Sequence, residues 1–483
     1  MRKVFMIIVS VLISCFPGSG RKMPKAKASN AGTQYIESAF VVYDGMQKKI
    51  HSLAELGYIE YESCALLSSH LEENGFVLER GVAGIPTAFV ATFGSGSPVI
   101  GILAEYDALP GMSQDTVSFK KALVEGGAGH GCGHNLLGTG SVAGAVAISK
   151  WLAEGHEGTV KLFGCPAEEG GGGKAYMARE GCFDGVDVVL DWHPDICNLV
   201  NTESGLANVQ MRFTFHGTSS HASSAPEKGR SALDAVEAFN FMMNMMREHV
   251  PDGTRIHYAI TDGGKAPNVV PDRAQVLYYL RNGSREVVAD LKERALKAAQ
   301  GAAMGTGTEM EYEVVSGNFE RLHVESLASV LQNNLEAVGG VIYDERETQF
   351  AKDMLLSTGI KDMSVLDKPA TVLPLGCDYP TLKGVSSDVG NVTWVAPTAS
   401  FRAATFVPAG LGHCWQGSSS GGTTIGTKGV MNVAKVLFFT AYDLYCSPET
   451  VKAVKEEFEI KRGRDFVFEP LIGDRQPPLD YRK

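Results

Sequence analysis

The chain has little positive charge and, beyond its first twenty residues, no long apolar run. Its 44 Lys and Arg residues against 55 Asp and Glu residues leave a formal net charge of −11. A nucleic-acid partner is therefore not expected, because phosphate contacts need a basic surface. A membrane-spanning helix needs about 20 consecutive apolar residues. No bilayer span is therefore expected after the start of the chain.

Cysteine is also sparse, whereas glycine is abundant. The nine cysteines among 483 residues have neither the density nor the close pairing of a disulfide-stabilised scaffold. Most of them are expected to be small buried residues. The 55 glycines gather in segments such as 126–144, 170–173 and 417–429. Such clusters indicate tight turns or a close approach of the backbone to a ligand.

The first thirty residues have the pattern of a targeting segment. Arg2 and Lys3 precede the apolar run 4–13, which is the order of a secretory signal and is too short for a membrane span. Residues 12–15 resemble a bacterial lipobox, in which Cys15 would carry the lipid. We expect a secreted or periplasmic lipoprotein anchored through Cys15, with plain signal cleavage or a cytoplasmic chain as alternatives. The residues up to 30 would form a flexible tether.

The remaining chain is too long for one compact core, and its pattern predicts an α/β domain in two parts. Over 31–206, helical patterns alternate with short apolar strands at 88–93, 99–103, 160–163 and 186–190. This alternation predicts a mostly parallel sheet sandwiched by helices. The pattern resumes over 321–446 and ends in an apolar helix. Residues 447–483 are expected to form a tail on the surface.

Residues 207–320 differ from the segments on either side. In 208–215 apolar residues alternate with polar ones, which predicts a strand with one wet face. A helix (231–248), two strands (255–260 and 273–281), a second helix (286–304) and a last strand (310–315) are expected to follow. The order βαββαβ is that of a ferredoxin-like module. We therefore predict a second domain of this kind, inserted into the first.

Metal-ligating and acidic side chains lie at the ends of the predicted strands or just before helices. In chain order they are Cys132, His134, Glu168, Glu169, His193 and His413. Open α/β sheets bind ligands at the carboxyl ends of their strands. Taken singly, each residue is more often structural, as in a glycine-rich loop or a solvated turn. Their recurrence at strand ends, in a mixture of ligand types, favours a metal site.

This mixture of residues suits a hydrolase with two divalent ions. The Cys-x-His pair puts a thiolate and an imidazole within reach of one ion, and a thiolate can bridge two. Adjacent carboxylates point in different directions, so one of Glu168 and Glu169 can bind metal while the other faces a water molecule. Metal binding lowers the pKa of water from about 15.7 to about 7, so a nearby glutamate can take its proton at neutral pH.

Motifs spread over residues 35–445 resemble the metal-dependent aminoacylase/carboxypeptidase superfamily, in particular its amidohydrolase branch with a cysteine ligand. They occupy residues 104–110, 129–137, 166–174, 191–194, 217–226, 268–271, 387–390 and 412–416. The resemblance implies that two divalent ions, Zn or Mn, would be bridged by Cys132 and completed by His134, Glu169, His193 and His413. It also implies Glu168 as the general base.

Two further implications concern the residues around the metal ions. Asp107 would orient a metal ligand, a role that metal sites commonly need. Where more distant relatives have a histidine two residues before this aspartate, the chain has Glu105. That departure fits the cysteine branch, in which the Cys-x-His pair supplies the replacement ligand.

For the inserted domain the resemblance implies a lid that also forms a homodimer. His221 would reach the active site of the partner subunit and stabilise the tetrahedral oxyanion. Asn268 and Arg281 would grip the carbonyl or carboxylate of the substrate. The alternatives are a loop-capping role for His221 and a surface charge at a strand end for Arg281.

The predicted function is hydrolysis of the amide bond of an N-acyl or N-aroyl amino acid, with an aroyl-glutamate as the specific expectation. A broader N-acyl-amino-acid hydrolase or a small-peptide carboxypeptidase or dipeptidase is the alternative among enzymes. A relative that only binds its ligand is disfavoured, because the five ligands and the base are all present. The expected partners are a small-molecule substrate and a second copy of the chain, with a homologous subunit as the alternative and membrane attachment only through the lipid anchor.

Overall fold

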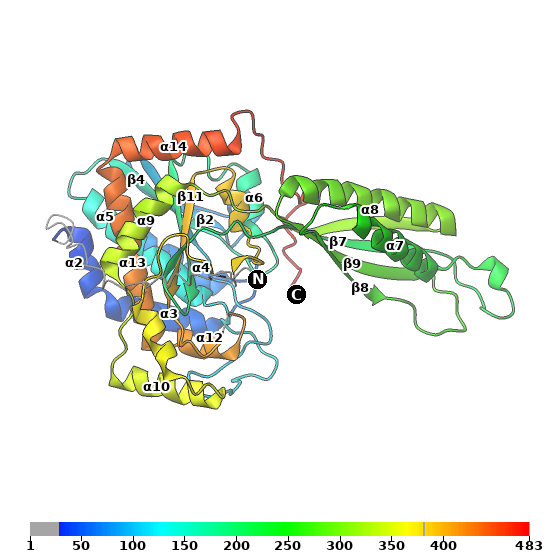
Figure 1. Ribbon diagram of the computed structural model, residues 1–483, viewed down its shortest axis with the longest axis horizontal. Helices are drawn as coiled ribbons and strands as arrows, with labels where there is room; N and C mark the ends of the chain where they lie inside the picture. Colours follow the sequence, from blue (N-terminus) through cyan, green and yellow to red (C-terminus); the bar gives the residue numbers. More distant parts are fainter. Residues whose placement is uncertain (1–28, 380–381, 411, 483) are drawn as a thin grey trace, which may run out of the picture.

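The protein is described by a computed structural model that covers residues 29–379, 382–410 and 412–482. The expected signal, Cys15 and nearly all of the tether lie outside these residues. Two sheets organise the described chain, one in a large body and one in an arm that extends from it (Figure 1). Within the described residues, no helix is both long and apolar enough to cross a membrane.

The body is built on a seven-stranded sheet in the order β1-β2-β4-β3-β5-β11-β6. The four central strands β4, β3, β5 and β11 are parallel, and the outer strands pair antiparallel at both edges. This confirms the predicted parallel core. The strands are β1 (Val77–Arg80), β2 (Phe89–Ser95), β3 (Val99–Ala104), β4 (Gly158–Gly164), β5 (Val188–Asp195), β6 (Leu199–Asn201) and β11 (Thr398–Ala404).

Helices cover both faces of this sheet, because its central strands are apolar on both sides. In β3, Ile100 and Ile102 belong to the core beneath α5 and α13, whereas Leu103 belongs to the core on the other face. The first face carries α2 (Ala31–Ser38), α3 (Phe40–Leu53), α4 (Tyr61–Glu73), α5 (His134–Leu152), α9 (Glu325–Val338), α13 (Thr424–Tyr445) and α14 (Pro448–Arg462). The second carries α6 (Gly173–Arg179) and α11 (Val389–Thr393).

The arm is a four-stranded antiparallel sheet in the order β10-β7-β9-β8, with two helices on one face. Val209, Met211, Phe213 and Phe215 of β7 are fully buried against these helices. The order of elements confirms the predicted ferredoxin-like module. They are β7 (Ala207–His216), α7 (Ala232–Met246), β8 (Arg255–Asp262), β9 (Arg273–Asn282), α8 (Arg285–Thr306) and β10 (Glu309–Asn318).

Several elements were not expected from the sequence pattern, among them strands β1, β6 and β11 and helix α11. Three further helices were also unexpected. Helix α10 (Glu345–Ser357) lies within 321–446 and begins at a capping box between Asp344 and Glu347. The tail expected after residue 446 begins with helix α14, and a short helix, α12 (Trp415–Gly421), precedes α13. Short 3-10 turns complete the described chain: η1 (Val82–Gly84), η2 (Pro226–Lys228), η3 (Arg247–His249) and η4 (Met363–Ala370).

Candidate metal centre

The predicted metal ligands meet at the carboxyl edge of the central strands. Asp107 follows β3, and Glu168 and Glu169 follow β4. His193 was expected just beyond its strand, but β5 extends to Asp195, so His193 lies within it and pairs with β11. Parallel strands end at the same edge, so this topology brings together side chains that are far apart in sequence.

A glycine gives the Cys-x-His pair its geometry. Gly133 has a φ of +78° and caps helix α5, which starts at His134. A Cβ added at Gly133 would come within 2.6 Å of the Phe406 ring and 2.9 Å of Pro194. Only glycine meets both conditions without strain. The tight turn directs Cys132 and His134 toward the same space.

The loop that carries the two glutamates is held by contacts from distant parts of the chain. Ala167 has a positive φ of 57°, which costs free energy in a residue with a Cβ. Its N–H donates to the buried carboxyl group of Glu60 at 2.8 Å. Tyr481 and Arg482, near the end of the chain, both donate to the backbone carbonyl of Glu169, at 3.2 and 2.8 Å.

Among the described residues, two groups of donor atoms share one thiol, and a third group, Glu105, His134 and Glu168, shares His134 with the first. Cys132, His134 and His193 make up one group, and Cys132, Glu169 and His413 make up the other, with the ligand atoms of each group all within 4.8 Å of one another. Cys132 Sγ lies 3.3 Å from His193 Nε2, and His413 Nε2 lies 3.2 Å from Glu169 Oε1. The arrangement matches a pair of ions bridged by a thiolate.

Buried polar atoms in this centre lack hydrogen-bond partners, which is the condition expected of metal ligands. His134 Nε2 and Glu169 Oε1 are both buried and make no hydrogen bond of good geometry among the described residues. Each nevertheless lies 3.2 Å from another ionisable group, Glu105 and His413 respectively. Leaving such atoms unsatisfied is costly, and a divalent cation would satisfy both. Thiolate, imidazole and carboxylate are ligands that suit zinc. The residues therefore fit the metal pair that the resemblance implies.

Asp107 connects the two halves of the centre. One carboxylate oxygen contacts His134 Nδ1 at 2.8 Å, and the other accepts the Glu169 N–H at 2.9 Å. This leaves Nε2 of His134 directed at the metal space, the orientation that a carboxylate partner gives to ligating histidines. Burial lowers the pKa of His134, but Cys132 and Asp107 outweigh it and raise that pKa well above its usual value.

Glu168 lies in a strongly acidic and half-buried environment. Burial, followed by the charges of Glu105 and Glu169, raises its pKa well above the usual value. Cations bound between these residues would oppose this rise and favour the carboxylate that a general base needs. Glu168 also faces the cavity beside the metal ligands. Its position therefore suits the predicted proton transfer.

A buried lysine compensates part of this negative charge, and the sequence interpretation gave it no role. Lys174 is fully buried, with its ammonium 2.6 Å from Glu105 and 2.7 Å from Asp388. The second oxygen of Glu105 lies 3.2 Å from His134 Nε2. A lysine among the small and apolar residues of α6 was the available signal, because lysine is rarely buried without a partner.

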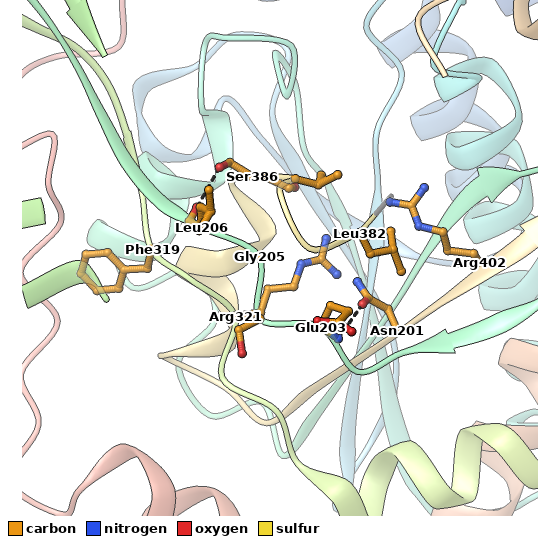
Figure 2. Close-up of a pocket in the computed structure, with 12 residues that line it drawn as sticks. Asn201, Glu203, Gly205, Leu206, Phe319, Arg321, Leu382, Ser386 and Arg402 are labelled. Atoms are coloured by element: carbon orange, nitrogen blue, oxygen red, sulfur yellow. Dashed lines mark hydrogen bonds between the residues drawn. The ribbon is translucent and has the colours of Figure 1, made fainter. Parts of the chain in front are cut away.

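A cavity of about 330 Å³ opens beside the donor groups. Its lining includes Cys132, Glu168, His193 and two arginines that the sequence interpretation missed, Arg321 and Arg402. Figure 2 shows both guanidinium groups near Leu382, in a smaller hollow that shares these residues with the main cavity. Neither arginine belongs to one of the motifs, and an isolated arginine carries no positional signal.

The three predicted lid residues lie elsewhere in the described chain. His221 and Asn268 are exposed in loops of the arm, and Arg281 on β9 packs 4.1 Å over the ring of Tyr279. None of them lines the cavity beside the donor groups. The ring nitrogen Nδ1 of His221 accepts the Ser224 N–H at 3.2 Å, which is the contact of a loop-capping histidine. The predicted role of His221 in a partner subunit stays a prediction.

Sequence comparisons place the chain among known hydrolases. A model of the peptidase family M20/M25/M40 matches residues 101–386. One of the subunits of the p-aminobenzoyl-glutamate hydrolase of Escherichia coli is 37% identical over 88% of this chain and 93% of its own length. The Xaa-Arg dipeptidase of Mus musculus is 26% identical over 92% of this chain and 95% of its own length.

Solved structures share the fold. An aminobenzoyl-glutamate utilization protein from Klebsiella pneumoniae matches with a TM-score of 0.58 and 17% identity, covering 84% of this chain and 97% of its own. A dinuclear metal-binding peptidase of the M20 family from Bacillus subtilis matches with a TM-score of 0.53 and 17% identity, covering 83% and 99%. The chain therefore belongs to the peptidase family M20/M25/M40, and it is a hydrolase of amide or peptide bonds.

Proposed function

We propose that this protein hydrolyses the amide bond of N-acyl or N-aroyl amino acids such as p-aminobenzoyl-glutamate, with Glu168 as the general base. The observation that carries the proposal is the pair of donor groups that share Cys132 beside a cavity. Glu168, which precedes the predicted ligand Glu169, faces that same cavity. The similarity to the E. coli hydrolase over most of both chains supports the substrate class.

The site residues divide the work between holding metal and moving a proton. Cys132, His134 and His193 would hold one divalent ion, and Glu169 and His413 would complete the site of a second one on the same thiolate. Ions held there would lower the pKa of a water molecule and polarise the scissile carbonyl. Glu168 would take the proton from that water and deliver it to the leaving amine. Asp107 keeps His134 and the Glu169 loop in place.

Zinc and manganese are the two metals proposed. The thiolate and three imidazoles favour zinc over harder cations, whereas the carboxylate suits manganese. The alternative function is that of a broader N-acyl-amino-acid hydrolase or a dipeptidase, which the similarity to the mouse Xaa-Arg dipeptidase supports. Turnover of a panel containing an aroyl-glutamate, an acyl-aromatic amino acid and a dipeptide decides between these functions.

The neighbouring glutamates provide a matched test of the proposed roles. Glu168→Gln should keep the metal content of the protein and lower kcat by about 10²–10⁴-fold, the usual contribution of a general base. Glu169→Gln should lower the metal content itself, because it removes a ligand. Both variants are measured by elemental analysis and by turnover in the same metal buffer. Unchanged kcat in Glu168→Gln would remove that residue from the mechanism.

The proposal extends to assembly through the arm. Phe241 and Met245 of α7 are 66% and 52% exposed, and Tyr258 and Ile260 are exposed on the edge strand β8. Apolar side chains on an unpaired edge suit a homodimer, and a hetero-oligomer with a homologous subunit is the alternative. If the exposed apolar face of α7 and β8 forms the dimer, sedimentation of Phe241→Glu should show a monomer. An unchanged mass would refute the arm interface.

A secreted or periplasmic location, with a lipid on Cys15, is part of the same proposal. Its support is the order of charged and apolar residues over 2–13 and the lipobox at 12–15. Cys15→Ala should release the protein from the membrane fraction of expressing cells. Equal partition of both forms would refute the anchor.

A further inference from the structure

The cavity beside the donor groups has two chemically different walls. Ile196, Leu382, Val385 and Phe406 supply apolar surface, which suits an acyl or aryl group. Arg321 and Arg402 supply two guanidinium groups in the same cavity. In a chain with a net charge of −11, two arginines in one cavity need an explanation.

Arg321 comes from the segment that leads out of the arm. It lies three residues after β10, and its backbone N–H donates to the carbonyl of Ser204 at 2.8 Å. Its guanidinium donates to Ser400 at 2.9 Å and lies 3.9 Å from Asp191, with 13% of the side chain exposed. These contacts fix the guanidinium at the cavity wall, and the nearest carboxylate lies beyond hydrogen-bond distance.

Arg402 lies on β11 directly opposite His193 in the parallel neighbour β5. Its guanidinium donates to Asp195 at 3.1 Å, and 13% of the side chain is exposed. The Nε–H is buried and has no hydrogen-bond partner among the described residues. An unsatisfied buried donor on a charged group is costly, and a carboxylate in the cavity would satisfy it.

We infer that Arg321 and Arg402 bind the two carboxylates of an acidic amino acid, and so select a dicarboxylic leaving group. The inference rests on the proposed amide hydrolysis and adds its specificity. Guanidinium groups match carboxylates with paired hydrogen bonds. An N-acyl amino acid has one carboxylate on its α-carbon, so a second guanidinium calls for a second one on the side chain. A basic leaving group, as in an Xaa-Arg dipeptide, would be repelled by both arginines.

The test compares three substrates in which one carboxylate at a time is replaced by an amide. They are N-(4-aminobenzoyl)-glutamate, its side-chain amide (the glutamine analogue) and its α-amide (the isoglutamine analogue), and kcat/KM is measured on the metal-loaded enzyme. For each amide, kcat/KM should be lower than for the glutamate substrate by about 10–100-fold or more, because the amide leaves one buried guanidinium without its carboxylate partner. This comparison uses the unsubstituted protein, so it does not depend on the folding of a variant.

The variant Arg321→Gln then shows which of the two substrate carboxylates Arg321 binds. The variant should bring kcat/KM for the glutamate substrate to within about threefold of one of the two amides, while turnover of that amide changes little. Arg80→Gln, a substitution at a surface arginine paired with Glu72, is the matched control and should keep the full discrimination. Arg402→Gln should reduce recognition of the other carboxylate. Arg402 also contacts His193, so the substitution at Arg321 is the cleaner test.

Binding of the free amino acids gives a readout apart from turnover. Calorimetry should show glutamate binding to the metal-loaded protein more tightly than either glutamine or isoglutamine, with one of these two differences lost in Arg321→Gln. Equal kcat/KM for the glutamate substrate and both amides would overturn the inference and leave the amide hydrolysis standing. No turnover of any of these or of other N-acyl amino acids would instead overturn the proposed function.

Discussion

The buried ammonium of Lys174 offers a quantitative test of how the acidic centre is stabilised. It lies 2.6 Å from Glu105 and 2.7 Å from Asp388, and all three side chains are buried. Lys174→Met keeps the length and apolar volume of the side chain but leaves two carboxylates without their cation. Removing one partner of a buried ion pair costs about 3–5 kcal/mol. We expect a loss of that size in the free energy of unfolding.

Lys48→Met is the matched control. Lys48 forms an ion pair with Asp44 at 2.8 Å, nearly the same distance, but 44% of the lysine side chain is exposed. A surface pair of this kind contributes about 0–1 kcal/mol. The two variants therefore differ mainly in burial, and their free energies of unfolding should differ by about 3 kcal/mol.

The effect of Lys174→Met should also depend on pH. Burial raises the pKa of Glu105 and of Asp388, and the charge of Lys174 opposes both shifts. Without the lysine, both carboxyl groups bind protons more tightly in the folded than in the unfolded state, so stability is lost as pH rises. Urea unfolding of the metal-free protein at several pH values measures this. A loss no larger than that of Lys48→Met at neutral pH would refute the reasoning.

Two further predictions concern the loop of Glu168 and Glu169. Burial, then the charge of Asp107, raises the pKa of Glu60 to about 8 from 4.5, so the folded wild-type protein loses stability as pH rises between these values. Glu60→Gln should remove this loss, so that between pH 5 and 8 its free energy of unfolding in urea rises by on the order of a few kcal/mol relative to the wild type. Parallel pH profiles of stability for the two proteins would contradict this prediction. Deleting residues 479–483 removes the Tyr481 and Arg482 contacts to Glu169. Metal binding, measured by competition with a chelator, should weaken by about 10–100-fold. Unchanged metal affinity would exclude a role for these contacts.

The arm was predictable from the sequence because its elements have one wet face. Strands such as β9 alternate buried and partly exposed residues, and helix α8 begins at a serine cap. Patterns of this kind state both the type of element and its buried side. The central strands β3, β4 and β5 were predictable for a different reason, since they are short apolar runs between turn residues.

Strand β11 and helix α10 had weaker signals. The residues of β11 are small or polar apart from Phe401, so its place in the sheet depends on partners far away in sequence. The capping box that starts α10 was present in the sequence, but the first five residues of the helix are charged or polar and its apolar residues begin only at Phe350. Tertiary packing decides such cases more than local propensity.

Some residues of the candidate site could likewise be predicted from the sequence, and others could not. The predicted metal ligands could be proposed from the sequence because their residue types and neighbouring glycines form motifs. Glu60, Lys174, Arg321 and Arg402 could not, because each acts through neighbours that only the fold provides. Single charged residues between motifs look the same whether they face solvent or a cavity.

The metal content of Cys132→Ala is the sharpest test of a thiolate shared by two ions. Cys132 is the one residue common to both donor groups, so its loss should weaken both ions together. Elemental analysis of the purified wild type should find about two divalent ions per chain, as in two-metal hydrolases. We expect Cys132→Ala, still folded by circular dichroism, to lose most of both ions and its turnover. Full metal loading and wild-type turnover in this variant would contradict the shared thiolate.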